Sequence, residues 1–150
     1  MSVATRSSRS MGLAFRFVWL RPSSVRGPVV TDSIVLVEDD ISIRETVAEV
    51  LMSQGYEVHA FESAGEALDH LRSKPLPTMI LLDLMLAGMD GFEFRRVQLS
   101  DPRMASVPVA LMSGTSDVAA MASVLQAAAF LHKPFDLTAL LATVARTCGK

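Results

Sequence analysis

The 150-residue chain lacks the residues on which several classes of protein depend. It contains one cysteine, Cys148, so it can form neither an internal disulfide framework nor a cysteine-based metal site. No apolar run reaches the ~18–20 residues that span a bilayer. Residues 32–150 hold all 16 acids and nine of the 14 bases, a net charge of −7 that disfavours a nucleic-acid-binding face. We therefore expect a cytoplasmic protein with no direct contact with nucleic acid or membrane.

Residues 1–31 differ from the rest of the chain. They carry five arginines and no acid, and their apolar residues follow neither a helical nor a strand period. An acid-free segment rich in arginine and serine is also typical of an organellar transit peptide. We favour a disordered or mis-annotated N-terminal extension and place the folded domain in residues 32–150.

From residue 33 onward, short apolar strands alternate with helical patterns. Ser63, Asp117 and Asp136 each stand where a residue would cap the following helix. The alternation indicates βαβ units and a parallel sheet. The expected strands are 33–37, 56–61, 78–83, 107–112 and 129–132, and the expected helices are 41–54, 64–71, 92–99, 118–126 and 137–147.

The third expected strand ends on a carboxylate, Asp83. A buried, unpaired charge is too costly for the centre of a strand, but the carboxyl edge of a parallel sheet is where ligands bind. Taken alone, Asp83 could do no more than cap the next turn. However, Glu38 and Asp39 follow the first strand, Ser113 follows the fourth, and Lys133 follows the fifth. We therefore expect these five side chains at one edge of the sheet.

Three converging carboxylates require positive charge nearby. Lys133 can supply one cation, and hard oxygen ligands favour Mg²⁺ or Mn²⁺ as the other. A carboxylate beside a metal ion, a lysine and a hydroxyl is arranged to receive a phosphoryl group, with Asp83 as the nucleophile. The three histidines are scattered along the chain, and we expect them to be structural or exposed: His59, His70 and His132.

Four motifs follow the expected strands in this order: VEDD at 37–40, LDLM at 82–85 followed by GMDG at 88–91, MSG at 112–114, and KPF at 133–135. Together they resemble the receiver domain of two-component response regulators. Asp39 and Asp83 are 44 residues apart, Asp83 and Ser113 are 30 apart, and Ser113 and Lys133 are 20 apart. The resemblance implies an α/β fold of the flavodoxin-like (βα)₅ type, a doubly wound five-stranded parallel sheet with strand order 2-1-3-4-5.

The resemblance also implies a role for each site residue. Asp83 would be the phospho-acceptor, and Lys133 and Ser113 would hold the phosphoryl group. Ser113 and Phe130 would form the switch, although Phe130 could equally be a core residue. We expect Asp40 to cap the first helix and the Lys133–Pro134 peptide to be cis. The metal ligands would be Glu38, Asp39, Asp83 and the main-chain carbonyl of Met85.

The function implied is that of a phospho-acceptor signalling switch. It would take a phosphoryl group from a histidine kinase or phosphotransfer protein, and assist its own phosphorylation and dephosphorylation without being an enzyme otherwise. The signal would pass to an unknown downstream protein through the face formed by the fourth helix, fifth strand and fifth helix. The sequence ends directly after the fifth helix, so we expect a stand-alone receiver.

Two rival functions share parts of this pattern. An Asp-nucleophile phosphohydrolase needs a second acid two residues after the nucleophile, where this chain has Met85. A degenerate receiver would act by protein contact alone. Two departures from the family pattern keep this second alternative open: Ala87 replaces the usual proline, and Gln-Ala-Ala-Ala at 126–129 replaces the usual Gly-Ala and acidic run.

Overall fold

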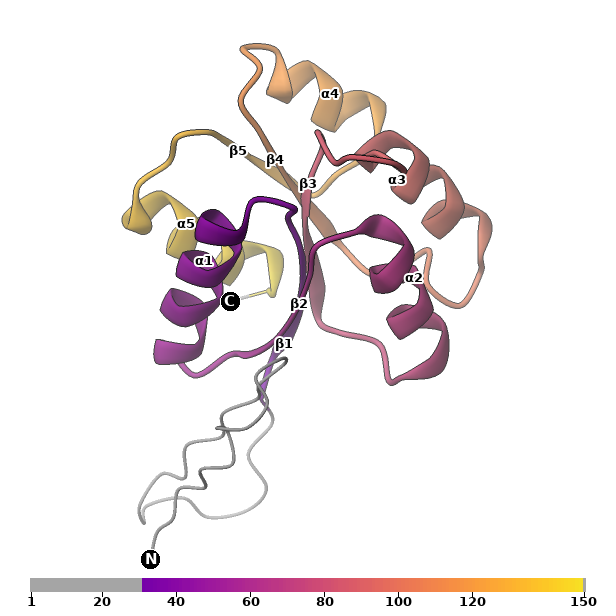
Figure 1. Cartoon of the computed structure of the whole chain (residues 1–150), viewed down its shortest axis with the longest axis horizontal. Helices are drawn as coiled ribbons and strands as arrows, with labels where there is room; N and C mark the ends of the chain where they lie inside the picture. Colours follow the sequence, from indigo (N-terminus) through magenta and orange to yellow (C-terminus); the bar gives the residue numbers. More distant parts are fainter. Residues whose placement is uncertain (1–30, 150) are drawn as a thin grey trace, which may run out of the picture.

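The computed structural model describes residues 31–149 and shows five strands alternating with five helices (Figure 1). All strands are parallel, and their order, β2-β1-β3-β4-β5, is the one predicted. The strands are β1 (Ser33–Val37), β2 (Glu57–Phe61), β3 (Met79–Asp83), β4 (Val109–Ser113) and β5 (Ala129–His132). The helices are α1 (Ile41–Ser53), α2 (Ala64–Ser73), α3 (Gly91–Ser100), α4 (Val118–Val124) and α5 (Leu137–Thr147).

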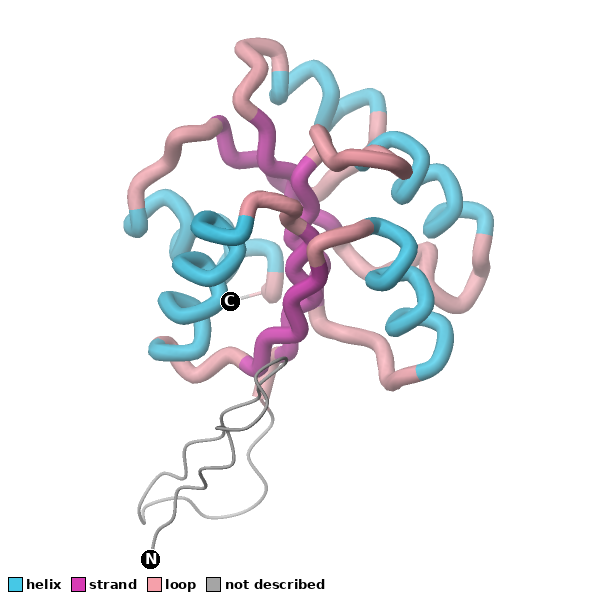
Figure 2. Tube along the Cα trace, viewed as in Figure 1, coloured by secondary structure: helices cyan, strands magenta, loops and turns pink. Residues whose placement is uncertain are grey.

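The sheet lies between two layers of helices. Helices α1 and α5 cover one face, and α2, α3 and α4 cover the other (Figures 1 and 2). Because successive residues of a strand point to opposite faces, side chains of β1 pack against both layers of helices. Ile34 and Leu36 pack with apolar residues of α1 and α5, whereas Val35 and Val37 pack with those of α2 and α3. Every residue of β3 and β4 is buried, so these two strands form the centre of the core.

The fourth helix is shorter than the sequence predicted. We expected it to continue to Gln126, but α4 ends at Val124, and Leu125 and Gln126 form a turn. Gln126 has a left-handed backbone, with φ of 57°, which is incompatible with a continuing right-handed helix. Asp117 occupies the position before α4, but its side chain makes no capping hydrogen bond, contrary to expectation. Ser63 and Asp136 do cap their helices as predicted.

Within residues 31–149, no helix combines the length and the apolar character needed to cross a bilayer. The N-terminal extension expected at residues 1–31 lies outside the described residues, apart from Thr31. The domain boundary at residue 32 stays a prediction.

Candidate functional site

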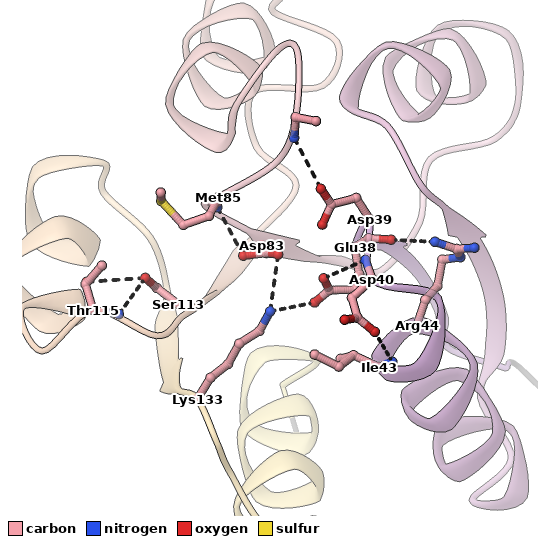
Figure 3. Close-up of polar contacts among 11 residues, drawn as sticks. Glu38, Asp39, Asp40, Ile43, Arg44, Asp83, Met85, Ser113, Thr115 and Lys133 are labelled. Atoms are coloured by element: carbon pink, nitrogen blue, oxygen red, sulfur yellow. Dashed lines mark hydrogen bonds and ion pairs between the residues drawn. The ribbon is translucent and has the colours of Figure 1, made fainter.

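The parallel sheet brings the predicted residues to one edge. Asp83 is the last residue of β3 and Ser113 is the last of β4. Glu38 directly follows β1, and Lys133 directly follows β5. Because β1 and β4 are the two neighbours of β3, Asp83 lies centrally among these strand ends (Figure 3).

Three carboxylates meet at this edge. Glu38, Asp39 and Asp83 can each offer an oxygen within 4.8 Å of the other two. Glu38 and Asp83 are buried, whereas Asp39 is exposed, so the acid cluster opens to solvent on the Asp39 side. A set of carboxylate oxygens with no histidine or cysteine fits a hard divalent cation such as Mg²⁺.

Lys133 supplies the cation that these carboxylates require. Its Nζ donates to Glu38 Oε1 at 2.8 Å and to Asp83 Oδ2 at 3.2 Å (Figure 3). Burial lowers the pKa of Lys133, but the ion pairs with Glu38 and Asp83 outweigh that effect, and the pKa is raised overall. The Lys133–Pro134 peptide is cis, as predicted. The ammonium therefore stays charged and bridges two of the three acids.

The buried acid beside Lys133 holds a proton unusually well. Burial, helped by Asp83, raises the pKa of Glu38 to about 7, even though the Lys133 hydrogen bond acts in the opposite direction. Desolvation penalises the charged form of a carboxyl group, and a neighbouring carboxylate adds to this penalty. A divalent cation bound to the acid cluster would therefore compete with a proton on Glu38.

Main-chain N–H groups hold each carboxylate in place. Met85 N–H donates to Asp83 Oδ1 at 3.1 Å, and Asp40 N–H donates to Glu38 Oε2 at 3.1 Å. Ala87 N–H donates to Asp39 Oδ2 at the longer distance of 3.3 Å. Asp39 is thus the least tightly held of the three acids.

A glycine allows α3 to pack directly against the loop after Asp83. A Cβ atom at Gly91 would lie 2.7 Å from Leu84 Cα and 2.9 Å from the Asp83 carbonyl oxygen. The Gly91 N–H donates to the Leu84 carbonyl at 3.0 Å across this contact. Any side chain at position 91 would displace the segment that carries Asp83, which explains the glycine at the end of the GMDG motif.

The two predicted switch residues differ in burial. Ser113 is buried, and its Oγ donates to Thr115 Oγ1 at 3.3 Å and accepts the Thr115 N–H at 3.2 Å (Figure 3). Phe130 is 44% exposed, so its interpretation as an ordinary core residue is wrong. The switch role of both residues and the metal-ligand role of the Met85 carbonyl stay predictions.

The residues just after the acid pair have distinct roles. Asp40 accepts the Ile43 N–H at 3.0 Å and so caps α1, as predicted. Arg44, to which the sequence assigned no role, donates from Nη1 to the Glu38 carbonyl at 2.9 Å. Because its partner is a main-chain carbonyl, no pattern in the sequence could have identified this contact.

Comparison with known proteins agrees with this geometry. A model of the response regulator receiver domain matches residues 34–145. The DNA-binding transcriptional regulator NtrC of Klebsiella pneumoniae is 37% identical over 114 residues, which cover 74% of this chain and 24% of NtrC. The response regulator protein FleR of Pseudomonas aeruginosa is 37% identical over 115 residues, which cover 75% of this chain and 24% of FleR.

Solved structures give the same result. Chemotaxis response regulator CheY4 of Vibrio cholerae is 27% identical, with a TM-score of 0.73, and the match covers 79% of this chain and 99% of CheY4. A putative response regulator from Chloroflexus aurantiacus is 25% identical, with a TM-score of 0.75, and the match covers 81% of this chain and 100% of that structure.

The protein therefore has a doubly wound, CheY-like fold with an acidic pocket at the carboxyl edge of its sheet. The chain belongs to the response regulator receiver domain family of two-component systems, whose members are signalling switches. It spans about a quarter of the length of the curated relatives NtrC and FleR. The stand-alone organisation expected from the sequence stays a prediction.

Proposed function

We propose that this protein accepts a phosphoryl group on Asp83, with Mg²⁺, from a histidine kinase or phosphotransfer protein in the cytoplasm. The observation that carries the proposal is the position of the Asp83 carboxylate. It ends the central strand, contacts Lys133 at 3.2 Å, and shares the acid cluster with Glu38 and Asp39. We also propose that the receiver unit begins at residue 32.

The chemistry follows from this arrangement. An oxygen of Asp83 attacks the phosphorus, and the bond from phosphorus to the donor nitrogen breaks with its electron pair left on the donor. Lys133, already bonded to Asp83, pairs with an oxygen of the transferred group. Mg²⁺ held by Glu38, Asp39, Asp83 and the Met85 carbonyl would neutralise charge on the phosphoryl oxygens. The Ser113 hydroxyl turns from Thr115 toward the new phosphoryl group.

The output surface that we propose is the face of α4, β5 and α5. Three large apolar side chains on these elements are exposed, Val124 at 69%, Leu137 at 52% and Phe130 at 44%. Residues 118–129 contain no charged side chain, so a downstream protein would dock here through apolar and main-chain contacts. NtrC is a DNA-binding protein by name, whereas we propose that this acidic chain contacts another protein and not nucleic acid.

The test is the intact mass of the protein after incubation with acetyl phosphate. Wild type should gain the mass of one phosphoryl group in Mg²⁺ and should gain none when EDTA is present. Asp83→Ala should gain none in either condition. Asp69→Ala, which changes an acid on α2 that pairs with Arg72, should behave as wild type. Labelling of Asp83→Ala would contradict the assignment, and an unlabelled wild type would favour the degenerate receiver that acts by protein contact alone.

A further inference from the structure

Arg44 reaches back from α1 to the segment that carries the acid pair. Its Nη1 donates to the Glu38 carbonyl oxygen at 2.9 Å (Figure 3). Its Nη2 lies 3.9 Å from Glu62 Oε1, beyond the end of β2. The Arg44 side chain is only 16% exposed, whereas that of Glu62 is 66% exposed. An ion pair with so exposed a partner contributes little. The important contact of Arg44 is therefore the one with the Glu38 carbonyl.

That carbonyl belongs to the peptide that joins Glu38 to Asp39. The pairing of β1 with both of its neighbours, β2 and β3, ends at Val37, so the sheet provides no partner for the Glu38 carbonyl. The N–H of Glu38 is already bonded to the Phe61 carbonyl at 3.0 Å. A main-chain carbonyl in a buried segment needs a hydrogen-bond donor, and Arg44 provides it. Arg44 thereby fixes the orientation of the peptide from which both acids extend.

The two acids depend on this peptide to different degrees. The Glu38 carboxylate is held separately, by Lys133 at 2.8 Å and by the Asp40 N–H at 3.1 Å. The exposed Asp39 carboxylate has one long contact, with the Ala87 N–H at 3.3 Å. The direction in which Asp39 points is therefore set mainly by its main chain, which Arg44 holds.

We propose that Arg44 is a positioning residue for the divalent-cation site. It acts through the Glu38–Asp39 peptide, which it holds so that Asp39 faces Glu38 and Asp83. This inference rests on the proposed function, because it requires that the acid cluster bind Mg²⁺. The proposal also predicts the direction in which removal of Arg44 changes the affinity for Mg²⁺. If Arg44 acted only as a nearby positive charge, its removal would strengthen cation binding by relieving repulsion, whereas loss of a positioning contact must weaken it.

The test is calorimetric titration of the full chain with Mg²⁺ alone. Arg44→Met keeps the length and apolar stem of the side chain but removes every donor, and should raise the Mg²⁺ Kd about tenfold, as loss of a contact behind a ligand does. Arg44→Lys keeps the positive charge and one donor nitrogen, and should recover most of that loss. Arg72→Met, which removes an exposed arginine from α2, and Glu62→Gln should both leave the Kd unchanged.

Labelling with acetyl phosphate provides a second measurement. Arg44→Met should label slowly at low Mg²⁺ and reach the wild-type rate when Mg²⁺ is saturating, a rescue that a general loss of stability would not show. A thermal melt checks that each variant is folded, and Arg44→Gln replaces Arg44→Met if the latter is not. Unchanged or tighter Mg²⁺ binding in the folded variant would overturn the inference. Wild type that binds no Mg²⁺ would instead overturn the proposed function, and the inference with it.

Discussion

At the scale of single residues, Met85 distinguishes this site. Its main-chain N–H is bonded to Asp83 Oδ1 at 3.1 Å, and its side chain is 63% exposed. Figure 3 shows this side chain extending from the loop after Asp83 toward the segment of Ser113 and Thr115. A thioether makes no strong hydrogen bond with water, and the Thr115 hydroxyl is already engaged with Ser113. Neither side chain is suited to orient a water molecule that attacks a phosphoryl group on Asp83.

We therefore predict that Met85→Asn shortens the half-life of the phosphorylated protein. An amide at this position can hold an attacking water, and a water-positioning group contributes about tenfold or more in rate. The measurement is the loss of the phosphorylated mass with time after the donor is removed. Val124→Asn makes the same kind of change at an exposed site on α4 and should leave the half-life unchanged. The water-exclusion argument is wrong if Met85→Asn decays no faster than wild type.

The sequence predicted the charged residues of the site better than their contacts. Asp83 and Lys133 could be found because parallel strands that end on polar residues place them at one edge of the sheet. Arg44 could not be found in that way. Its partner is a main-chain carbonyl, and such a contact leaves no pattern in the sequence. The direction of the Ser113 hydroxyl toward Thr115 depends on local rotamers, which spacing does not determine.

At the scale of elements, the C-terminal end of α4 is held by α3. Arg95, which is buried, donates from Nε to the Leu125 carbonyl at 2.9 Å and from Nη2 to the Gln126 carbonyl at 2.8 Å. Its Nη1 donates to Gln98 Oε1 at 2.7 Å. The last carbonyls of a helix have no partner within the helix, so a side chain from the neighbouring helix satisfies the end of α4.

Removal of this guanidinium should destabilise the whole domain. Arg95→Leu leaves two main-chain carbonyls and the Gln98 amide oxygen without their donor, and should reduce the free energy of unfolding by about 3 kcal/mol. Urea titration measures this loss. Arg103→Leu is the matched control, because Arg103 also donates to two main-chain carbonyls, of Leu71 and Lys74, but is exposed. Water can hydrogen-bond to those carbonyls once the Arg103 side chain is removed, so Arg103→Leu should lose less stability than Arg95→Leu. An equal loss in both variants would contradict the argument.

The turn after α4 contains a residue in an unfavourable conformation. Gln126 has φ of 57°, which costs about 1–2 kcal/mol for a residue with a Cβ atom. Its side chain is exposed, so Gln126→Gly loses little packing. Glycine also gains freedom in the unfolded chain, and the net expectation is a gain of about 0.5–1 kcal/mol in the free energy of unfolding.

The control for this prediction is a second exposed glutamine at a helix end. Gln54 has φ of −96°, so Gln54→Gly relieves no strain and should leave stability unchanged or lower. Thermal or urea unfolding of both variants gives the comparison. Destabilisation by Gln126→Gly equal to that by Gln54→Gly would show that the backbone of Gln126 carries no strain.

The same turn explains where element prediction from the sequence was inaccurate. Alanine, methionine and leucine continue the helical signal through residue 126, but the turn is fixed by Arg95, which lies 30 residues before Leu125. Asp117 has ψ of 30°, outside the extended region that a capping side chain requires. The N-caps of α1, α2 and α5 are extended, as for Asp136 with ψ of 171°, and their side chains make the capping hydrogen bond.

At the scale of the whole molecule, order and topology could be predicted because short apolar strands alternate with helical patterns along the chain, as βαβ units do. What the sequence could not provide was the electrostatic consequence of folding. Folding buries Glu38 and Asp83 beside a single bridging lysine. The buried carboxylates lower the free energy of unfolding. Protons or cations that bind to them offset this loss, so their binding is linked to the stability of the whole domain.

The sign of that linkage follows from the pKa of Glu38. Burial raises it to about 7 from an ordinary 4.5. Between these values the folded protein holds more protons at Glu38 than the unfolded chain does, so this contribution to stability falls as pH rises through the interval. Above pH 7 the penalty is complete, on the order of 3 kcal/mol. Burial also lowers the pKa of His70, in a different part of the molecule. A histidine with a lowered pKa makes a contribution to stability that rises with pH, opposite to that of Glu38.

We therefore predict that Mg²⁺ stabilises the protein more at about pH 8 than at about pH 5.5, because at the lower pH it must displace a proton from Glu38. Thermal melts in EDTA and in saturating Mg²⁺ at both pH values provide the measurement. Glu38→Gln separates the contributions of Glu38 and His70 to the pH dependence of stability, because it removes the Glu38 carboxyl group and leaves His70 unchanged. Its melting temperature in EDTA should rise relative to wild type at the higher pH, and its response to Mg²⁺ should be weak at both. A Mg²⁺ shift in wild type that is equal at the two pH values, or larger at the lower one, would show that Glu38 is not protonated in the cation-free protein.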